Sequence, residues 1–426
     1  MSDFDTLDFF TDESLVNDPY PYFEHLRAKC PVVREQAQGT MAITSYDLIQ
    51  EVYRRTDDFS SCNAVIGPFA PFSTKPEGDD IEAFIAEHRR ELPMNEHFAT
   101  MDPPEHTQHR SLLHRLLTPK RLKENEDFMW RLADRQMDEF IAAGRCEWIT
   151  EYTKPFALLV VADILGVPEE EHDVVRRGLG LQRPGAMEEG DHDWKALNPL
   201  EFLDNLFITY IEDRRRAPRH DVLTDLATAT FPDGSVPEPI EVARVATFSF
   251  GAGQETTARL LATALRLFGE HPDLQARIRA NRQLIPAFVE ECLRYESPVK
   301  ADFRLAKRTT TLGDVEIPAG ATVMLLNGAA NRDPDRFACP DQFDVERPNA
   351  QAHLAFGRGV HSCPGGPLAR AEGRITIERV LERMGDIRIS TEHHGPPGNR
   401  RYTYEPSFII RGLSELHIEF TPLEGA

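Results

Sequence analysis

Positive charge is in short supply in this sequence. Its 426 residues hold 48 Lys and Arg against 70 Asp and Glu, which gives a formal net charge of -22 at pH 7. A chain this acidic repels phosphate groups and anionic headgroups, which argues against a general nucleic-acid binder and against docking on anionic lipid. A local basic face is still compatible with this balance.

Cysteine is also rare, and no long hydrophobic run is present. The six cysteines are scattered without a CxxC pair, at Cys30, Cys62, Cys146, Cys292, Cys339 and Cys363. This fits reduced thiols better than a disulfide framework. The acidic start, MSDFDTLDFFTDESLVND, does not resemble a signal peptide, and the most apolar run, 155–167, is too short to span a bilayer. We expect a cytoplasmic protein with no membrane anchor.

The order of elements points to many helices with a few short hairpins. The length alone favours two or three domains. The patterns predict a helix at 19–29, a hairpin at 31–45 with Gly39 at its turn, a long loop at 62–100, mostly helix over 105–300, a helix at 282–296, and strands within 303–325 and 407–420.

The clearest element is a long helix from Pro239 to Phe268. Proline lies in its first turn, apolar residues recur at i, i+3 and i+4, and Gly269 and Pro272 follow its end. About 30 residues at a rise of ~1.5 Å each span on the order of 45 Å, so this helix would cross the whole molecule. It is apolar on most faces, which predicts a buried helix.

One cysteine lies in a glycine-rich stretch before a helix, in FGRGVHSCPG at 356–365. Free N–H groups and the positive dipole end at a helix N-terminus would stabilise a Cys363 thiolate and lower its pKa. Gly357, Gly359 and Gly365 would let the backbone fold tightly around the sulfur. Such a thiolate could attack a substrate or bind a metal. Taken alone, the residue fits a buried structural cysteine better, which is the commonest role of the residue.

The complete pattern is F-G-x-G-x-H-x-C-x-G-x-x-L-A-R, and it resembles the haem-binding loop of the cytochrome P450 superfamily at every fixed position. The resemblance implies that Cys363 is the axial thiolate of haem b. It also implies that Phe356 packs beside the sulfur, with Gly357 and Gly365 shaping the loop, and that His361 reaches a haem propionate. Thiolate ligation favours cleavage of an O–O bond.

The middle of the long helix, AGQETT at 252–257, resembles the oxygen-side motif of the same family. Ala252 is small enough to leave room for a flat cofactor and O2, and Gly253 would permit a local distortion that frees carbonyls. Thr256 would supply a hydroxyl and Glu255, expected to be buried, a carboxylate for a proton relay. Without the family motif, these residues fit a polar patch on an amphipathic helix.

Two further elements match the family. DPPEHTQHR at 102–110 resembles its H-x-x-x-R element, which implies that His106 and Arg110 bind a propionate, and Arg304 matches a further propionate arginine. The E-x-x-R pair and its later partner have an implied structural role in a buried ionic triad of Glu291, Arg294 and Arg347.

The matches span residues 102–370, and the implied architecture is mainly α with a small β region. It is a single triangular cytochrome P450 domain over 1–426, which replaces the estimate of two or three domains. The implied activity is insertion of one oxygen atom of O2 into a lipophilic small molecule by hydroxylation or epoxidation, on a terpenoid, steroid or fatty acyl substrate. The residues expected around the substrate are mostly apolar: Phe69, Phe72, Met94, Phe98, Phe248, Ala252, Val299 and Phe408.

No flavin or iron–sulfur segment is recognisable, so electrons from NAD(P)H would arrive through a separate ferredoxin and ferredoxin reductase. Because ferredoxins are acidic, docking would need a local basic patch. The candidates are Arg115, Lys120, Arg121, Arg358 and Arg370, and we expect a monomer. Two other functions remain open. One is a haem-thiolate enzyme that uses peroxide or isomerises its substrate, which Glu255 and Thr256 disfavour; the other is a haem protein that senses a ligand.

Overall fold

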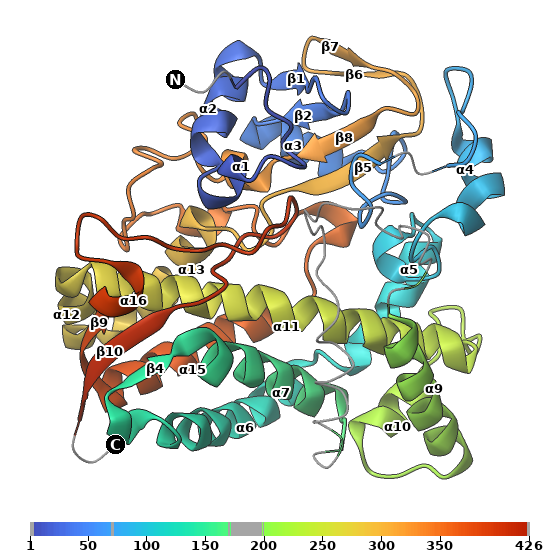
Figure 1. Ribbon diagram of the computed structural model, residues 1–426. Helices are drawn as coiled ribbons and strands as arrows, with labels where there is room; N and C mark the ends of the chain where they lie inside the picture. Colours follow the sequence, from blue (N-terminus) through green and yellow to red (C-terminus); the bar gives the residue numbers. More distant parts are fainter. Residues whose placement is uncertain (1–3, 70–71, 169–170, 172–197, 199, 424–426) are drawn as a thin grey trace.

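A computed structural model describes residues 4–69, 72–168, 171, 198 and 200–423 (Figure 1). The segment 172–197, part of the mostly helical stretch that we expected, therefore lies outside the described residues. The α-helices are α1 (Ser14–Asn17), α2 (Tyr20–Lys29), α3 (Tyr46–Arg54), α4 (Glu82–His88), α5 (Glu105–Ser111), α6 (Pro119–Asp138), α7 (Lys154–Leu165), α9 (Glu201–Arg216), α10 (Val222–Ala227), α11 (Pro239–Glu270), α12 (Pro272–Ala280), α13 (Ile285–Tyr295), α14 (Asn327–Ala330), α15 (Gly366–Arg383) and α16 (Thr391–His394).

The strands form three small sheets. They are β1 (Val32–Arg34), β2 (Met41–Ile43), β3 (Phe59–Ser60), β4 (Arg145–Glu147), β5 (Asp302–Ala306), β6 (Thr310–Leu312), β7 (Val315–Ile317), β8 (Thr322–Leu325), β9 (Met384–Ile389) and β10 (His417–Pro422). The five-stranded sheet has the order β1-β2-β8-β5-β3, in which only β2 and β8 pair in parallel. The expected hairpin at 31–45 is confirmed, because β1 and β2 pair antiparallel and Gly39 takes a φ of +69° between them.

Helix α11 confirms the predicted long helix and continues two residues past Phe268, to Glu270. Its start is fixed by a capping box in which Glu238 and Glu241 bind each other's backbone N–H, next to Pro239 in the first turn. Figure 1 shows α11 crossing the middle of the molecule, with the five-stranded sheet on one side and α6, α7 and α15 on the other. The largest hydrophobic cluster surrounds it and includes Phe250, Leu261 and Leu265.

Two sequence expectations are wrong in part. The 62–100 segment is not all loop: α4 forms because Ile81 and Ile85 are both buried at an i, i+4 spacing. The alternating stretch 407–420 is a strand only from His417 onward. Before that, the Ser407 hydroxyl accepts the backbone N–H groups of Ile409 and Ile410, at 3.2 and 3.0 Å, so these donors are not used in a strand ladder.

Candidate functional site

The cysteine loop lies between the five-stranded sheet and the start of α15. Gly357 and Gly359 have φ values of +59° and +71°, which favour glycine. A Cβ atom on Gly359 would lie 2.2 Å from the backbone oxygen of Tyr53, at the end of α3, so no side chain fits there. The Cys363 N–H donates to the Phe356 carbonyl at 2.8 Å, which closes the loop around the sulfur.

The Cys363 side chain is solvent-accessible at the mouth of α15. Dense protein around the sulfur raises the pKa of the thiol, while the backbone N–H groups of Gly365 and Gly366 and the charge of Arg110 act to lower it. We expected these helix-start N–H groups to lower the pKa overall; the net direction is opposite because desolvation outweighs them. Gly365 has a φ of -79°, so its contribution is its N–H and not a left-handed turn.

Beside the loop, two histidines and two arginines gather. The rings of His106 on α5 and His361 lie 3.9 Å apart between centroids, and Arg110 donates to the Ser362 carbonyl. Burial first, then Arg110 and Arg304, lowers the pKa of His106 to about 4. Burial, followed by the charges of Arg304 and its neighbours, lowers the pKa of His361 to about 2. Both imidazoles are therefore neutral near pH 7, and the positive charge comes from the arginines.

These two histidines and two arginines suit the edge of a cofactor that carries negatively charged groups. Both ring nitrogens of His106 and Nε2 of His361 are buried without a hydrogen-bond partner among the described residues. Arg304 has one carboxylate close to it, Asp302 at 3.0 Å. Buried polar atoms normally have partners, so donors left unpaired beside two guanidinium groups are what a pair of propionates would satisfy. The small residues of the cysteine loop and Ala252 on α11 suit a flat group next to the Cys363 sulfur.

The central part of α11 is an unbroken helix. The Thr256 hydroxyl donates to the Ala252 carbonyl at 3.0 Å, so this carbonyl is occupied and not free. A Cβ atom on Gly253 would come within 2.9 Å of Val161 Cγ2 on α7. The expected distortion at Gly253 is thus wrong for this structure, in which glycine allows close packing of two helices.

Glu255 is not buried, contrary to our expectation. Its side chain is 24% exposed, and its Oε2 atom lies 3.0 Å from Nη2 of Arg259, one turn further along α11. The ion pair leaves part of the Glu255 side chain in contact with solvent. Glu255 lies on the same helix as Thr256, α11.

The predicted ionic triad comes together in full. Arg294 binds both carboxylate oxygens of Glu291 at 2.7 Å, and Arg347 Nε lies 3.1 Å from Glu291 Oε1. Glu291 and Arg294 are completely buried. The two arginines also donate to the carbonyl of Gln342, at 3.1 and 2.9 Å, so the triad fixes the chain that leads into the cysteine loop.

The predicted substrate-contact residues do not form one group. Phe98 and Phe248 pack edge to face with ring centroids 5.1 Å apart, next to Ala252 on the same helix. Phe408 is 1% exposed and belongs to a different cluster, against Phe69 at 6.0 Å and Phe10 at 5.4 Å. Phe72 packs on Phe84, with 5.0 Å between ring centroids, and Val299 pairs by a backbone bridge with Ile410. Sequence could not separate these sites because Phe69, Phe72, Val299 and Phe408 lie outside helices and strands, in segments whose direction is set by tertiary packing.

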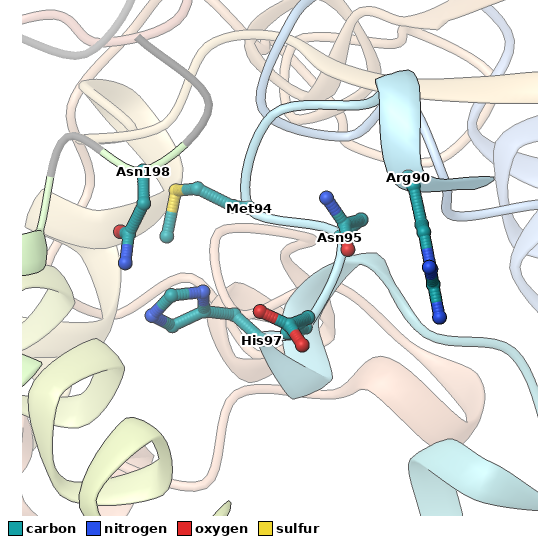
Figure 2. A pocket seen from close by; sticks show the side chains of 6 residues that line it. Arg90, Met94, Asn95, His97 and Asn198 are labelled. Carbon is teal, nitrogen blue, oxygen red and sulfur yellow. The ribbon is translucent and has the colours of Figure 1, made fainter. Parts of the chain in front are cut away.

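Met94 lines a polar pocket of about 280 Å³ near the start of α11 (Figure 2). Its φ of +55° is rare for a non-glycine residue, and its carbonyl accepts the Thr100 hydroxyl at 2.7 Å. Figure 2 shows His97 and Asn198 on the same pocket wall. The lining residues are Arg90, Met94, Asn95, Glu96, His97 and Asn198.

The predicted basic patch is largely paired. Arg121 lies 3.1 Å from Glu124, and Arg370 binds Glu290. Arg358 donates to the Ala352 carbonyl at 3.1 Å. Lys120 is 85% exposed with a loose contact to Glu124 at 3.7 Å, and Arg115 is exposed. These last two cations are therefore the most available to a partner among the described candidates.

Two residues near the cysteine were missed by the sequence reasoning. Glu290 and His353 are both buried and lie 3.2 Å apart between Oε2 and Nε2. The only signals were the doubled glutamate in VEECLRY and a histidine just before the cysteine loop.

Comparison with known proteins assigns the family. The family model described as Cytochrome P450 matches residues 191–385. The chain is similar to Cytochrome P450 144 of Mycobacterium tuberculosis, at 34% identity over 96% of this chain and 90% of that protein. It is also similar to Cytochrome P450 monooxygenase PikC of Streptomyces venezuelae, at 31% identity over 95% of this chain and 91% of that protein.

Among solved structures, the chain resembles substrate-free Mycobacterium marinum cytochrome P450 CYP150A6. The identity is 58% and the TM-score 0.92, over 98% of this chain and 99% of that one. No helix in the described part of the chain is long and apolar enough to span a membrane. The mainly helical architecture with small sheets is confirmed as the cytochrome P450 fold, and the chain belongs to the cytochrome P450 family of haem-binding monooxygenases, which are oxidoreductases.

Proposed function

We propose that this chain inserts one oxygen atom from O2 into a lipophilic small molecule, with electrons delivered from NAD(P)H by a separate ferredoxin and ferredoxin reductase. The observation that carries the proposal is the group of unpaired, buried histidine nitrogens and two arginines beside the exposed Cys363 sulfur. That donor set suits the iron and the two propionates of haem b.

In this proposal Cys363 would bind the haem iron, Phe356 would shield the sulfur, and His106, Arg110, Arg304 and His361 would hold the propionates. Bound through a thiolate, the haem would supply the reductive cleavage of O2. The protein's part is to orient the cofactor between α11 and α15 and to exclude water from its faces.

Thr256 and Glu255 would handle protons on the α11 side. The Thr256 hydroxyl is held by the Ala252 carbonyl at 3.0 Å, so its proton has a fixed position on the helix surface. Glu255 pairs with Arg259 and is in reach of solvent water. Rotation of Glu255 away from Arg259 would bring a solvent-derived proton to the Thr256 end of the relay.

A lipophilic substrate would contact the Phe98 and Phe248 rings near Ala252. Two similar proteins support steroid or fatty acyl substrates. One structure is described as CYP109E1 of Bacillus megaterium with corticosterone, at 25% identity. Another is P450BioI with an acyl carrier protein that bears hexadec-9Z-enoic acid, at 26% identity. The polar pocket at Met94 and His97 is a candidate position for an oxygen-bearing end of such a molecule.

Turnover of the purified protein tests this proposal. Steroids and fatty acids that displace the absorption band of the ferric haem would be incubated with a surrogate ferredoxin, its reductase and NADH. We expect a product one oxygen atom heavier. Thr256→Ala should lower its yield per NADH by about 10²-fold, and Thr256→Ser should restore it because a hydroxyl is kept. Product formation with peroxide alone, or no product from any substrate that shifts the band, would contradict the proposal.

The electron donor has its own test. Arg115 is exposed and belongs to the proposed docking patch, so Arg115→Glu should slow reduction by ferredoxin at low salt and leave substrate affinity unchanged. The matched control is Arg145→Glu, an exposed arginine at the start of β4. Equal reduction rates for the two variants at several ionic strengths would argue against this docking face. We also propose a monomer located in the cytoplasm.

A further inference from the structure

Glu290 is a buried carboxylate with two partners, and it is not part of the ionic triad formed by its neighbour Glu291. Its side chain is 4% exposed. Arg370, on the first turns of α15, donates through Nε to one oxygen and through Nη2 to the other, the latter at 3.2 Å. His353 approaches the second oxygen, with Nε2 at 3.2 Å. Burial raises the pKa of Glu290, but the hydrogen bonds from His353 and Arg370 outweigh it and bring the pKa to about 2, so the carboxylate is ionised.

His353 is neutral, with a defined tautomer. It is 1% exposed, and burial lowers its pKa even though Glu290 acts to raise it. Its Nδ1 atom accepts the backbone N–H of Ala355 at 3.2 Å, so the proton is on Nε2 and faces Glu290. Glu290 therefore connects α13, α15 and the chain just before the cysteine loop.

The same side chains hold the Phe356 ring. The guanidinium of Arg370 lies 4.7 Å from the centre of this ring, and the His353 ring lies 5.6 Å from it. A guanidinium above an aromatic face is attractive, and the bidentate contact with Glu290 keeps its plane fixed. Phe356 is also bound through its backbone, because its carbonyl accepts the Cys363 N–H at 2.8 Å.

Arg370 also acts on the sulfur directly. Its Nη1 atom lies where a Cβ atom on Gly366, three residues after Cys363, would be only 3.2 Å away, so its positive charge contributes to the electrostatic field at the sulfur. The negative charge of Glu290 offsets part of that field. Groups that hydrogen-bond and orient a metal ligand control the affinity and the electronic character of the site.

We propose that Glu290, His353 and Arg370 form a carboxylate bracket that positions Phe356 against Cys363 and sets how strongly the cysteine sulfur donates electrons to a bound haem iron. The proposal rests on the haem-thiolate function above. The three members are positioning residues, since they act through Phe356 and through charge and not on the substrate.

The bracket predicts opposite electrostatic effects for its two charged members. Glu290→Gln removes a negative charge and leaves Arg370 less compensated, which favours the added electron of the ferrous state. The ferric/ferrous midpoint potential of the holoprotein should therefore shift upward. Arg370→Gln removes a positive charge, and the midpoint should shift downward. A role in stability alone predicts no such change of sign.

A second readout separates positioning from charge. Arg370→Lys keeps the charge and loses the planar contact with Phe356, so its midpoint should stay near that of the wild type. Its thiolate-type ferrous carbonyl spectrum should decay about tenfold faster than that of the wild-type protein, and Glu290→Gln should decay similarly. The matched control is Arg374→Gln, one turn further along α15, where the guanidinium binds Glu126 at 2.8 Å. This control should keep the wild-type decay rate.

All proteins would be compared at equal haem content, with far-UV circular dichroism to verify folding. Equal midpoints and decay rates for Glu290→Gln, Arg370→Lys and Arg374→Gln would overturn the bracket. So would haem loss in Glu290→Gln with Arg370→Lys unaffected, because positioning requires both partners. If instead the wild-type protein gives no thiolate-type carbonyl spectrum, the proposed function fails and not the bracket alone.

Discussion

The two sides of the long helix α11 differ in how closely their buried polar side chains are paired. On the cysteine side, Glu290, Glu291 and Arg294 are buried, and each has ion-pair or hydrogen-bond partners at 2.7–3.2 Å. On the pocket side, defined by residues 90–97, Asp204 and Arg244, close pairs such as Arg244 with Glu96 at 2.5 Å occur beside looser contacts at His97 and Asp204. His97 Nε2 lies 3.5 Å from Asp204 Oδ1, and Arg244 Nε lies 3.8 Å from Asp204 Oδ2.

This difference indicates which side is rigid. Satisfied networks of buried charges lock their surroundings into one arrangement, whereas unpaired buried groups can rearrange when a ligand provides partners. Within the described residues, His97 has no hydrogen bond at either ring nitrogen, although it is 1% exposed. We infer that the network of α13 and α15 that supports the cysteine loop is preorganised, whereas the His97 pocket and the unpaired His106 and His361 adapt to a ligand that supplies partners.

The largest effect should come from the sulfur itself. Cys363→Ser replaces the proposed ligand with a weakly donating hydroxyl, and we expect complete loss of the thiolate-type ferrous carbonyl spectrum and of oxygen insertion. Cys339→Ser, at an exposed cysteine, is the control and should behave as the wild type. A thiolate-type spectrum that persists in Cys363→Ser would remove the basis for the whole cysteine side of the comparison.

Breaking the ionic triad should be the next largest change. Arg294→Ala removes the bidentate partner of the buried Glu291 and the donor to three backbone carbonyls, so the free energy of unfolding should fall by about 3–5 kcal/mol. The control is Arg277→Ala, which removes an exposed pair with Glu346 and should cost about 0–1 kcal/mol. Denaturant unfolding of both variants measures the gap, and similar losses would mean that the cysteine side is no more rigid than the surface.

Acidification should act on the cysteine side through His353. Burial lowers the pKa of His353 below its usual 6.5, so the unfolded chain takes up this proton first as the pH falls. The His353 contribution to stability is therefore present above pH 6.5 and is lost progressively below it. His353→Gln should lose less stability than the wild type between pH 6.5 and 5, as followed by denaturant unfolding at each pH. A parallel pH dependence in the two proteins would contradict this assignment.

The smallest effect is expected on the pocket side. Glu96 is 61% exposed and pairs with Arg244, so Glu96→Gln should change the free energy of unfolding by less than about 1 kcal/mol. Because Glu96 lines the pocket, the same variant should still change substrate affinity, measured by titration of the ferric haem absorption band. Unchanged affinity for every substrate would mean that the pocket is not used.

The sequence predicted those elements whose formation depends on residues close together in the chain. Helix α11 follows from its capping box and apolar spacing, and the β1–β2 hairpin follows from alternation around Gly39. The cysteine loop and the ionic triad came from a family pattern of fixed spacing. The contacts of the triad agree with that pattern, whereas the roles of the site residues remain proposals.

The parts that sequence could not predict depend on contacts between distant segments. Glu290 and Arg370 are 80 positions apart, and nothing local in either segment specifies their pairing. Phe408 matched the apolar character of a substrate wall, yet it packs with Phe10 and Phe69 because the N-terminal segment covers it. From the sequence, Gly253 predicted a local distortion of the helix. Only the position of Val161 on α7 shows that this glycine allows the two helices to pack closely.

The contact between Gly359 and the Tyr53 carbonyl has a consequence for how the protein is made. The cysteine loop packs directly against backbone atoms from the N-terminal part of the chain, and this contact helps to set its conformation. During synthesis, this contact can form only after most of the chain has left the ribosome and the sheet has formed. A fragment that starts beyond α3 would carry every residue of the cysteine motif and still lack the surface that shapes it.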